Sequence, residues 1–222
     1  SSLYIEGSET MNQIVSKTIS DSDVLKKEFT LFYSLCKRMF DIVISFIALV
    51  VLLPVILLFA LIVMIETPGS PFFLQERLGQ SGRPFTIMKL RSMYSDAEKN
   101  GAQWAVKNDS RVTRVGKLIR QTRIDELPQL WNVLKGDMSI VGPRPERAVF
   151  IEEFQKTLPS FSQRLAVKPG LTGWAQINGG YELTPAEKLE LDLYYIQHTN
   201  IRFDVKIMIK TLRVIVTGDG SR

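Results

Sequence analysis

The sequence predicts an α+β fold in which one globular domain is attached to a membrane by an apolar helix. Three patterns carry this prediction. Residues 42–65 contain no charged side chain, residues 72–93 alternate like two short strands around a glycine turn, and the C-terminal half shows amphipathic helix patterns. A chain of 222 residues, of which 45% are hydrophobic, can form one sizeable core.

The charge of the chain and its scarcity of cysteine and histidine restrict the classes of function. A net charge of +5 and a sequence pI of about 9.3 suit an anionic partner, such as nucleic acid, phospholipid headgroups or a phosphorylated substrate. The single Cys36 excludes an intramolecular disulfide. The single His198 excludes a Cys/His zinc site and disfavours a histidine-based catalytic triad.

Residues 1–36 are predicted to form an N-terminal extension, and residues 37–66 the membrane anchor. We interpret residues 1–10, which precede Met11, as a remnant of recombinant expression. A helix over the uncharged run would be about 36 Å long, enough to cross a hydrocarbon core of about 30 Å. Pro54 lies in the middle of the run and would remove one helical hydrogen bond.

Basic residues flank this run on both sides, whereas a spanning helix carries most of them on its cytoplasmic side. They are Lys26, Lys27, Lys37 and Arg38 before the run, and Arg77, Arg83, Lys89 and Arg91 after it. We therefore predict a re-entrant helix-break-helix anchor bent at Pro54, with a kinked spanning helix as the alternative.

Residues 67–222 are predicted to form the catalytic domain, which begins with a small β-hairpin. The polar positions of the hairpin are mostly basic, which fits either a solvated strand face or a surface that binds anions. From Arg111 to Arg123 a basic residue recurs every three positions between apolar ones. This pattern predicts an amphipathic helix, either interfacial or on an ordinary surface. Residues 184–196 and 204–216 predict two further helices, the second amphipathic and basic.

The stretch 121–146 combines acids with a stiffened arginine. A helix from about Glu126 to Leu134, closed by Gly136, would place Asp125 at or near its N-cap, so Asp125 is either a cap or a catalyst. Arg144 lies between two prolines, which fits either bidentate phosphate binding or a surface turn. In the turn-rich loop 167–180, Lys168 and Gln176 are candidate polar contacts.

Taken together, these motifs resemble the bacterial sugar transferase family, the monotopic phosphoglycosyl transferases that act on polyprenyl phosphates. The resemblance covers about residues 37–220 and suggests the minimal catalytic form of the family. It rests on KRMFDIVIS, an apolar run with a central proline, GSPFFLQERLG, FTIMKLRSM, TRIDELPQLWNVLKGDMSIVGPRPE and VKPGLTGWAQ.

The resemblance implies transfer of a sugar 1-phosphate from a nucleotide diphosphate sugar, with a UDP-sugar expected, to undecaprenyl phosphate. Nucleoside monophosphate is released, and the product initiates capsule, exopolysaccharide or glycan assembly at the cytoplasmic face of the bacterial cell membrane. Asp125 is the implied nucleophile, and Asp125 with Glu126 the implied Mg²⁺ site. The implied substrate-binding residues are Lys89, Arg91, Arg144 and Gln176. Membrane phospholipids are expected partners, and homo-oligomerisation is compatible with this reading.

Two departures from the family pattern leave details open. Leu53 precedes Pro54 where some members have serine, and Asn178-Gly179-Gly180 stands where many members place an arginine after the glycine. The sugar and the nucleotide are therefore not assigned. The alternatives are another membrane phosphotransferase, whose paired-aspartate CDP-alcohol motif the sequence lacks, and a membrane-tethered nucleic-acid binder. No nucleic-acid-binding signature is present in the sequence, so we expect no such partner.

Overall fold

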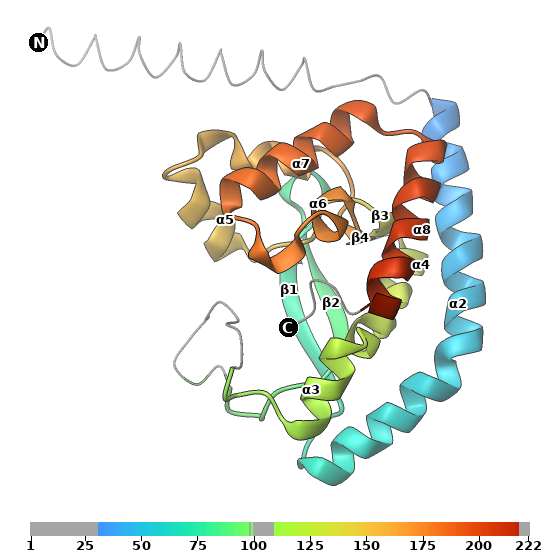
Figure 1. The fold of residues 1–222 in the computed structure, drawn as a ribbon, viewed down its shortest axis with the longest axis vertical. Coiled ribbons are helices and arrows are strands. Elements are labelled where there is room, and N and C mark those ends of the chain that lie inside the picture. The colour runs from blue at the N-terminus through green and yellow to red at the C-terminus, as the bar shows by residue number, and fades with distance from the viewer. Residues whose placement is uncertain (1–30, 98, 100–108, 218–222) are drawn as a thin grey trace, which may run out of the picture.

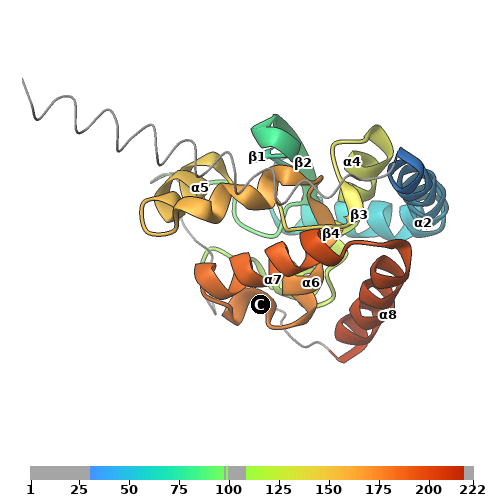
Figure 2. The ribbon, with the colours of Figure 1, turned by 90° about the horizontal axis from the view of Figure 1, so that it is seen from above.

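The computed structural model describes residues 31–97, 99 and 109–217, so most of the predicted N-terminal extension lies outside the described residues. The described part is mostly helical, with two small two-stranded sheets. The predicted α+β class therefore holds in the sense that helices dominate and the sheets are small. The helices are α2 (Leu31–Glu66), α3 (Arg114–Gln121), α4 (Leu130–Lys135), α5 (Ala148–Gln155), α6 (Trp174–Ile177), α7 (Pro185–His198) and α8 (Ile201–Thr217). The strands are β1 (Phe72–Leu78), β2 (Pro84–Leu90), β3 (Ser139–Val141) and β4 (Gly170–Thr172). Seen from above, α2 and α5 lie at opposite edges of the molecule (Figure 2).

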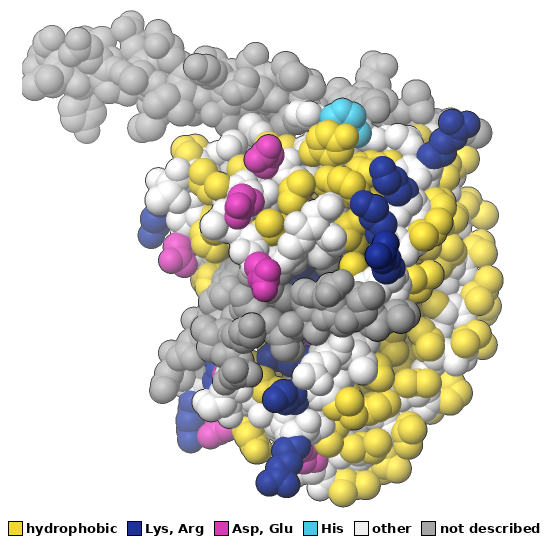
Figure 3. All heavy atoms as spheres, in the orientation of Figure 1, with side chains coloured by type: hydrophobic (Ala, Val, Ile, Leu, Met, Phe, Trp, Pro, Cys, Tyr) yellow, Lys and Arg dark blue, Asp and Glu magenta, His cyan; other side chains and the backbone are white. Residues whose placement is uncertain are grey.

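The apolar run forms part of the single long helix α2, which starts at Leu31, before the predicted anchor. Pro54 lies inside it, and Figure 1 shows the helix changing direction along its length, as expected where a proline removes a hydrogen bond. Only 17% of its most apolar window is buried. Its hydrophobic side chains are exposed along one side of the molecule (Figure 3), too large an apolar surface for water, so α2 indicates membrane association.

Both ends of α2 are fixed to the globular body. At the N-terminal end, Asp204 of α8 accepts hydrogen bonds from Lys37 (2.7 Å), Tyr33 (3.1 Å) and Tyr195 (2.8 Å). The Tyr33 hydroxyl also lies 2.6 Å from that of Thr199. We call these five residues the anchor network. At the C-terminal end, the Glu66 carboxylate accepts a hydrogen bond from the backbone of Val115 (3.0 Å).

The predicted hairpin is confirmed: β1 and β2 pair antiparallel, with Phe73 opposite Lys89 and Gln75 opposite Ile87. The connecting turn uses positive φ at Ser81 (56°) and Gly82 (74°), which glycine adopts without strain. In Figure 1 the hairpin starts beside α3 and the end of α2 and reaches up beneath α7. Asn132 of α4 fastens β2 by accepting from the Met88 backbone (3.2 Å) and donating to Thr86 (2.8 Å).

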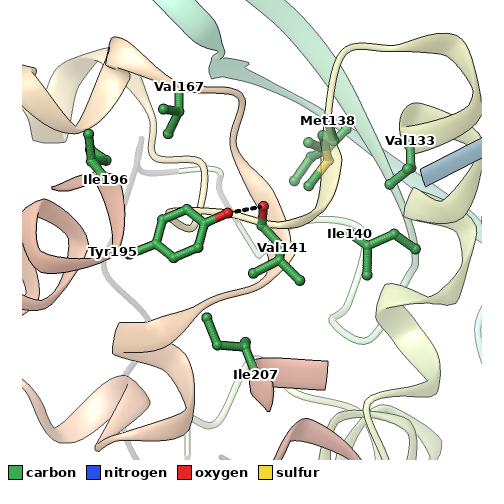
Figure 4. Packing of buried hydrophobic residues seen from close by; sticks show 9 residues of the cluster. Val133, Met138, Ile140, Val141, Val167, Tyr195, Ile196 and Ile207 are labelled. Carbon is green, nitrogen blue, oxygen red and sulfur yellow. Dashed lines mark hydrogen bonds between the residues drawn. The ribbon is translucent and has the colours of Figure 1, made fainter. Parts of the chain in front are cut away.

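The sequence did not predict the second sheet, in which β3 pairs parallel with β4. Ile140 and Val141 of β3 belong to the core in Figure 4, which joins β3 to α4, α7 and α8. The hydroxyl of the buried Tyr195 lies 3.1 Å from the Val141 carbonyl oxygen, so α7 is attached to β3.

The basic segment 111–123 forms a shorter helix than predicted, because α3 covers only Arg114–Gln121. Thr113 caps it by accepting a hydrogen bond from the Gly116 backbone (2.8 Å). Arg111 precedes the helix and pairs with Asp109 (2.6 Å), and Arg123 follows it with a φ of 56°. Both predicted C-terminal helices are confirmed as α7 and α8; α7 begins with a capping box of Thr184 and Glu187.

Candidate active site

A cavity of about 430 Å³ lies between the hairpin, the turn before α4 and the helix α7. The structure brings all the substrate-binding and catalytic residues predicted from the sequence to its lining: Lys89, Arg91, Asp125, Glu126, Arg144 and Gln176. Lys168 is not among the lining residues. The cavity collects many cations and few acids, as a site for an anionic substrate requires.

The two adjacent acids lie in a 3-10 turn, Ile124–Gln129, that leads directly into α4. Of the two alternatives for Asp125, the structure contradicts the N-cap: Arg123 occupies the position before the turn, and Asp125 lies within its first residues. The left-handed backbone of Arg123 is uncommon for a residue with a side chain, and such strain concentrates at functional sites. Pro128 fits inside the turn, and Gly136, with a φ of 100°, ends α4 as predicted.

Glu126 is held by two cations. Its carboxylate contacts Lys89 Nζ at 3.4 Å and forms an ion pair with the Arg144 guanidinium. Burial alone would raise the pKa of Glu126, but the charges of Arg144 and Lys89 hold that pKa well below its usual range. Glu126 is therefore ionised at neutral pH. We call Lys89, Asp125, Glu126 and Arg144 the dyad cluster.

Asp125 has a different environment. Its side chain is 7% exposed and lines the cavity, and no described residue makes a hydrogen bond or ion pair with its carboxylate. Burial raises its pKa, and the charge of Glu126 adds to the effect, against Lys89, Arg120 and Arg144, to give a pKa of about 6. At neutral pH the carboxylate is mostly ionised yet weakly solvated and unpaired, which suits a nucleophile.

Two predicted binding residues have structural partners. The Arg91 guanidinium donates to the Thr67 carbonyl (2.7 Å) and hydroxyl (2.9 Å) and to the Pro68 carbonyl (2.9 Å). It thereby holds the chain that leaves α2 and forms part of the wall of the cavity, and its role in substrate binding stays a prediction. Gln176 donates to the Leu171 carbonyl (3.0 Å), while its buried Oε1 has no partner among the described residues.

Sequence reasoning missed a second group of charges at the same cavity. Glu146 contacts Lys188 (3.4 Å), Arg77 (3.5 Å) and Arg164 (3.8 Å). Burial would raise the pKa of Glu146, but Lys188, Arg164 and Arg77 hold it below its usual range. Glu146 ends the motif of Arg144 and could have been suspected; Arg164 and Lys188 reach it from segments with no local signal.

Comparison with known proteins agrees with the geometry. A model of the bacterial sugar transferase family matches residues 32–218. A UDP-N-acetylgalactosamine-undecaprenyl-phosphate N-acetylgalactosaminephosphotransferase of Aeromonas hydrophila is 47% identical, over 86% of this chain and 46% of the relative. A putative undecaprenyl-phosphate N-acetylgalactosaminyl 1-phosphate transferase of Bacillus subtilis (strain 168) is 51% identical, over 74% of this chain and 88% of the relative. A UDP-glucose:undecaprenyl-phosphate glucose-1-phosphate transferase of Caulobacter vibrioides is 39% identical, over 83% of this chain and 71% of the relative. The chain thus spans about half of the Aeromonas relative and most of the other two.

Proposed function

The chain belongs to the bacterial sugar transferase family, and from this premise we propose that it transfers a sugar 1-phosphate from a UDP-sugar to undecaprenyl phosphate, the first step of a polysaccharide's assembly. One observation carries the proposal. Asp125 presents an unpaired carboxylate to a cavity that is also lined by Lys89 and Arg144. The positive charges of these two residues, which contact Glu126, can offset the charge of a diphosphate.

In the first half-reaction, the Asp125 carboxylate attacks the phosphorus that carries the sugar. The bond from this phosphorus to the bridging oxygen breaks, and UMP leaves with the electron pair. The phosphosugar is then an ester of Asp125. In the second half-reaction, a phosphate oxygen of undecaprenyl phosphate attacks the same phosphorus and releases the Asp125 carboxylate. Lys89 and Arg144 stabilise the negative charge on the transferring oxygens in both steps.

The dyad cluster also suits Mg²⁺. The described residues contain no group of three or more acidic, histidine or cysteine side chains that could hold a metal alone. Mg²⁺ commonly binds one or two carboxylates together with substrate phosphates, and Asp125 and Glu126 supply that number. When bound there, the ion would offset charge on the diphosphate. Glu126 would help to hold it and Asp125 would keep one oxygen for attack.

We further propose that α2 is re-entrant and that the active site faces the cytoplasm, where UDP-sugars are made. The support is geometric. The anchor network at one end of α2 and Glu66 at the other bind the same globular body. A spanning helix would separate its ends by a hydrocarbon core of about 30 Å, and one body could not hold both. Anionic phospholipids would face the exposed cations of α8, which form a row beside α2 in Figure 3.

The function is tested with a panel of UDP-sugars and undecaprenyl phosphate, following UMP release in detergent or nanodiscs. UDP-N-acetylgalactosamine is the first candidate, because two relatives are named for that sugar. Turnover should require the lipid acceptor, stop in EDTA and return with Mg²⁺. Turnover that continues in EDTA would contradict the metal assignment alone, whereas no UMP release with any sugar would contradict the proposed function.

The topology is tested with single cysteines in a Cys36→Ser background. Ser34→Cys and Ser70→Cys lie at exposed positions near the two ends of α2. Both should be protected from a membrane-impermeant thiol reagent in intact cells and labelled after the membrane is opened. Labelling of one site alone in intact cells would mean that α2 spans the membrane.

A further inference from the structure

The cavity has two chemically different ends, and the side chains on one face of β1 change in polarity from one end to the other. Phe73, Gln75 and Arg77 alternate along the strand, so their side chains share a face, and all three line the cavity. Read away from α2, this face passes from an aromatic ring to an amide and then to a guanidinium.

The far end of the cavity is polar and cationic. Arg77 meets Glu146 there, and Glu146 is bound in turn by Lys188 and Arg164. This end suits a water-soluble anion such as a nucleotide diphosphate sugar, which has hydrogen-bonding groups over its whole length.

The near end, on the side of the membrane helix, holds most of the large apolar side chains of the cavity. They are Phe72, Phe73, Leu90, Met93 and Tyr94, and the polar residues Ser70, Ser92, Arg111 and Arg120 also line the cavity on this side. We call this the apolar end. Phe72 and Leu90 also pack in one hydrophobic cluster with Ile56, Ala60 and Val63, all from the second half of α2. On the outer side of that half, Leu57, Leu58, Leu61 and Met64 are exposed. The apolar end of the cavity therefore adjoins the membrane helix through Phe72 and Leu90.

The apolar end adjoins the reactive group. Phe73 lies directly opposite Lys89 in the hairpin, and Lys89 contacts Glu126 of the dyad cluster. Opposite residues in an antiparallel pair have Cβ atoms about 5 Å apart. Phe73 is nevertheless 37% exposed and Tyr94 48% exposed. Two large aromatic side chains thus remain uncovered at the mouth of a charged site.

We propose that this apolar end, around Phe73 and Tyr94, binds the first isoprene units of the polyprenyl acceptor. The inference rests on the proposed function and names the acceptor's part of the site. An acceptor with a phosphate beside an apolar chain needs cations and apolar surface side by side, and here Lys89 and Phe73 are cross-strand neighbours. The acceptor then enters from the α2 side, while the donor enters from the Arg77 side, and the two substrates share only the dyad cluster.

The test separates the two half-reactions. Phe73→Ser and Tyr94→Ser remove aromatic surface from the apolar end, and Tyr194→Ser is the matched control, because Tyr194 is 45% exposed on α7 and is not among the lining residues. Without acceptor, UMP release from the donor should stay within about twofold of the unchanged protein in all three variants. With acceptor, Phe73→Ser and Tyr94→Ser should each raise the KM for undecaprenyl phosphate about tenfold, and the control should not. Loss of UMP release at unchanged acceptor KM would instead assign the rings to the donor, and unchanged values for both would overturn the proposal.

A second measurement needs no turnover. A polyprenyl phosphate with a photoreactive diazirine in its first isoprene unit is irradiated with the protein in nanodiscs, and the labelled peptides are mapped. Label is expected on the β1 segment and on the segment around Tyr94, with competition by unmodified polyprenyl phosphate. Label confined to α2 would overturn the inference even if the proposed function held. Label at the cavity without UMP release from any donor would keep the lipid site and reject the function.

Discussion

The dyad cluster and the anchor network each contain a buried aspartate, and the two are treated in opposite ways. Asp204 has partners on both carboxylate oxygens: Lys37 and Tyr33 on one, and Tyr195 on the other. Asp125 has burial but no direct partner among the described residues, and its cations are held by Glu126 instead. Asp204, whose carboxylate oxygens both have partners, holds α2 to the helices α7 and α8. Asp125, whose carboxylate has no direct partner among the described residues, stays available to a substrate.

The difference also predicts where the fold gives up stability for function. The anchor network joins α2 to α7 and α8, so its bonds stabilise the attachment of the membrane helix. Asp125 does the reverse, because burial and the charge of Glu126 raise its pKa to about 6. A carboxyl whose pKa is raised in the folded state destabilises that state once it is ionised. Neutralising Asp125 should therefore stabilise the fold, whereas neutralising Asp204 should destabilise it.

Asp125→Asn should have the largest effect on catalysis. The amide keeps the size of the side chain but cannot attack phosphorus, so UMP release without acceptor should fall by about a thousandfold or more. Intact-protein mass spectrometry should show a mass gain of one phosphosugar in the unchanged protein and none in the variant. Normal turnover of the variant would show that another group is the nucleophile.

The same variant should be more stable than the unchanged protein. The raised pKa of Asp125 corresponds to about 2–3 kcal/mol of destabilisation at pH 7.5, which the amide avoids. The gain should shrink as pH falls through 6 and disappear below about pH 3, where the carboxyl is protonated in both the folded and the unfolded state. Thermal unfolding in detergent with EDTA would measure it. A loss of stability would mean that Asp125 has a favourable partner in the folded state.

Asp204→Asn should reverse the pattern. The variant leaves the partly buried Lys37 without its counter-charge, and because breaking a fully buried pair costs about 3–5 kcal/mol, we expect a loss of about 2–3 kcal/mol here. Asp204 is not among the residues lining the cavity, so UMP release per folded molecule should stay within about twofold. Thermal unfolding and an active-site titration on the same sample would separate the two quantities. A stable but inactive variant would mean that the anchor network controls the chemistry.

The two clusters also differ in how well the sequence foretold them. Asp125, Glu126, Lys89 and Arg144 belong to short motifs with the residue types that phosphate chemistry needs, so they could be singled out before the fold was known. The anchor network joins residues more than 150 positions apart, such as Tyr33 and Thr199, which are 166 apart. No local sequence pattern indicates such a distant pairing, so none of the contacts of the anchor network was predicted from the sequence.

The fold shows the same division between local and distant signals. The hairpin, α7, α8 and the glycine that ends α4 follow from periodicity and turn residues, and all are confirmed. The parallel pair of β3 and β4 was missed, because strands of three residues are too short to show a period. The helix start expected at about Glu126, with Asp125 at or near its N-cap, was wrong, because the left-handed Arg123 starts a 3-10 turn that residue preferences do not encode.

Within the dyad cluster, Arg144→Lys should have a smaller effect than Asp125→Asn. Lysine keeps the positive charge beside Glu126 but loses the planar fork that can hold two phosphate oxygens at once. We expect UMP release to slow about tenfold to thirtyfold, with little change in thermal unfolding. An effect as large as that of Asp125→Asn would mean that the geometry of the guanidinium, rather than its charge, is essential. An unchanged rate would place Arg144 outside the phosphate site.

Thr199→Val should give the smallest effect, because it removes a single hydrogen bond from the anchor network. Valine has nearly the shape of threonine but cannot bond to the Tyr33 hydroxyl, 2.6 Å away. That hydroxyl keeps its bond to Asp204, so no buried donor is left without a partner, and the loss should be about 1 kcal/mol of stability. UMP release should not change, because Thr199 is not among the residues lining the cavity. In combination with Asp204→Asn the loss should be less than the sum, since both changes act on Tyr33, and a fully additive result would mean that the network's bonds act independently.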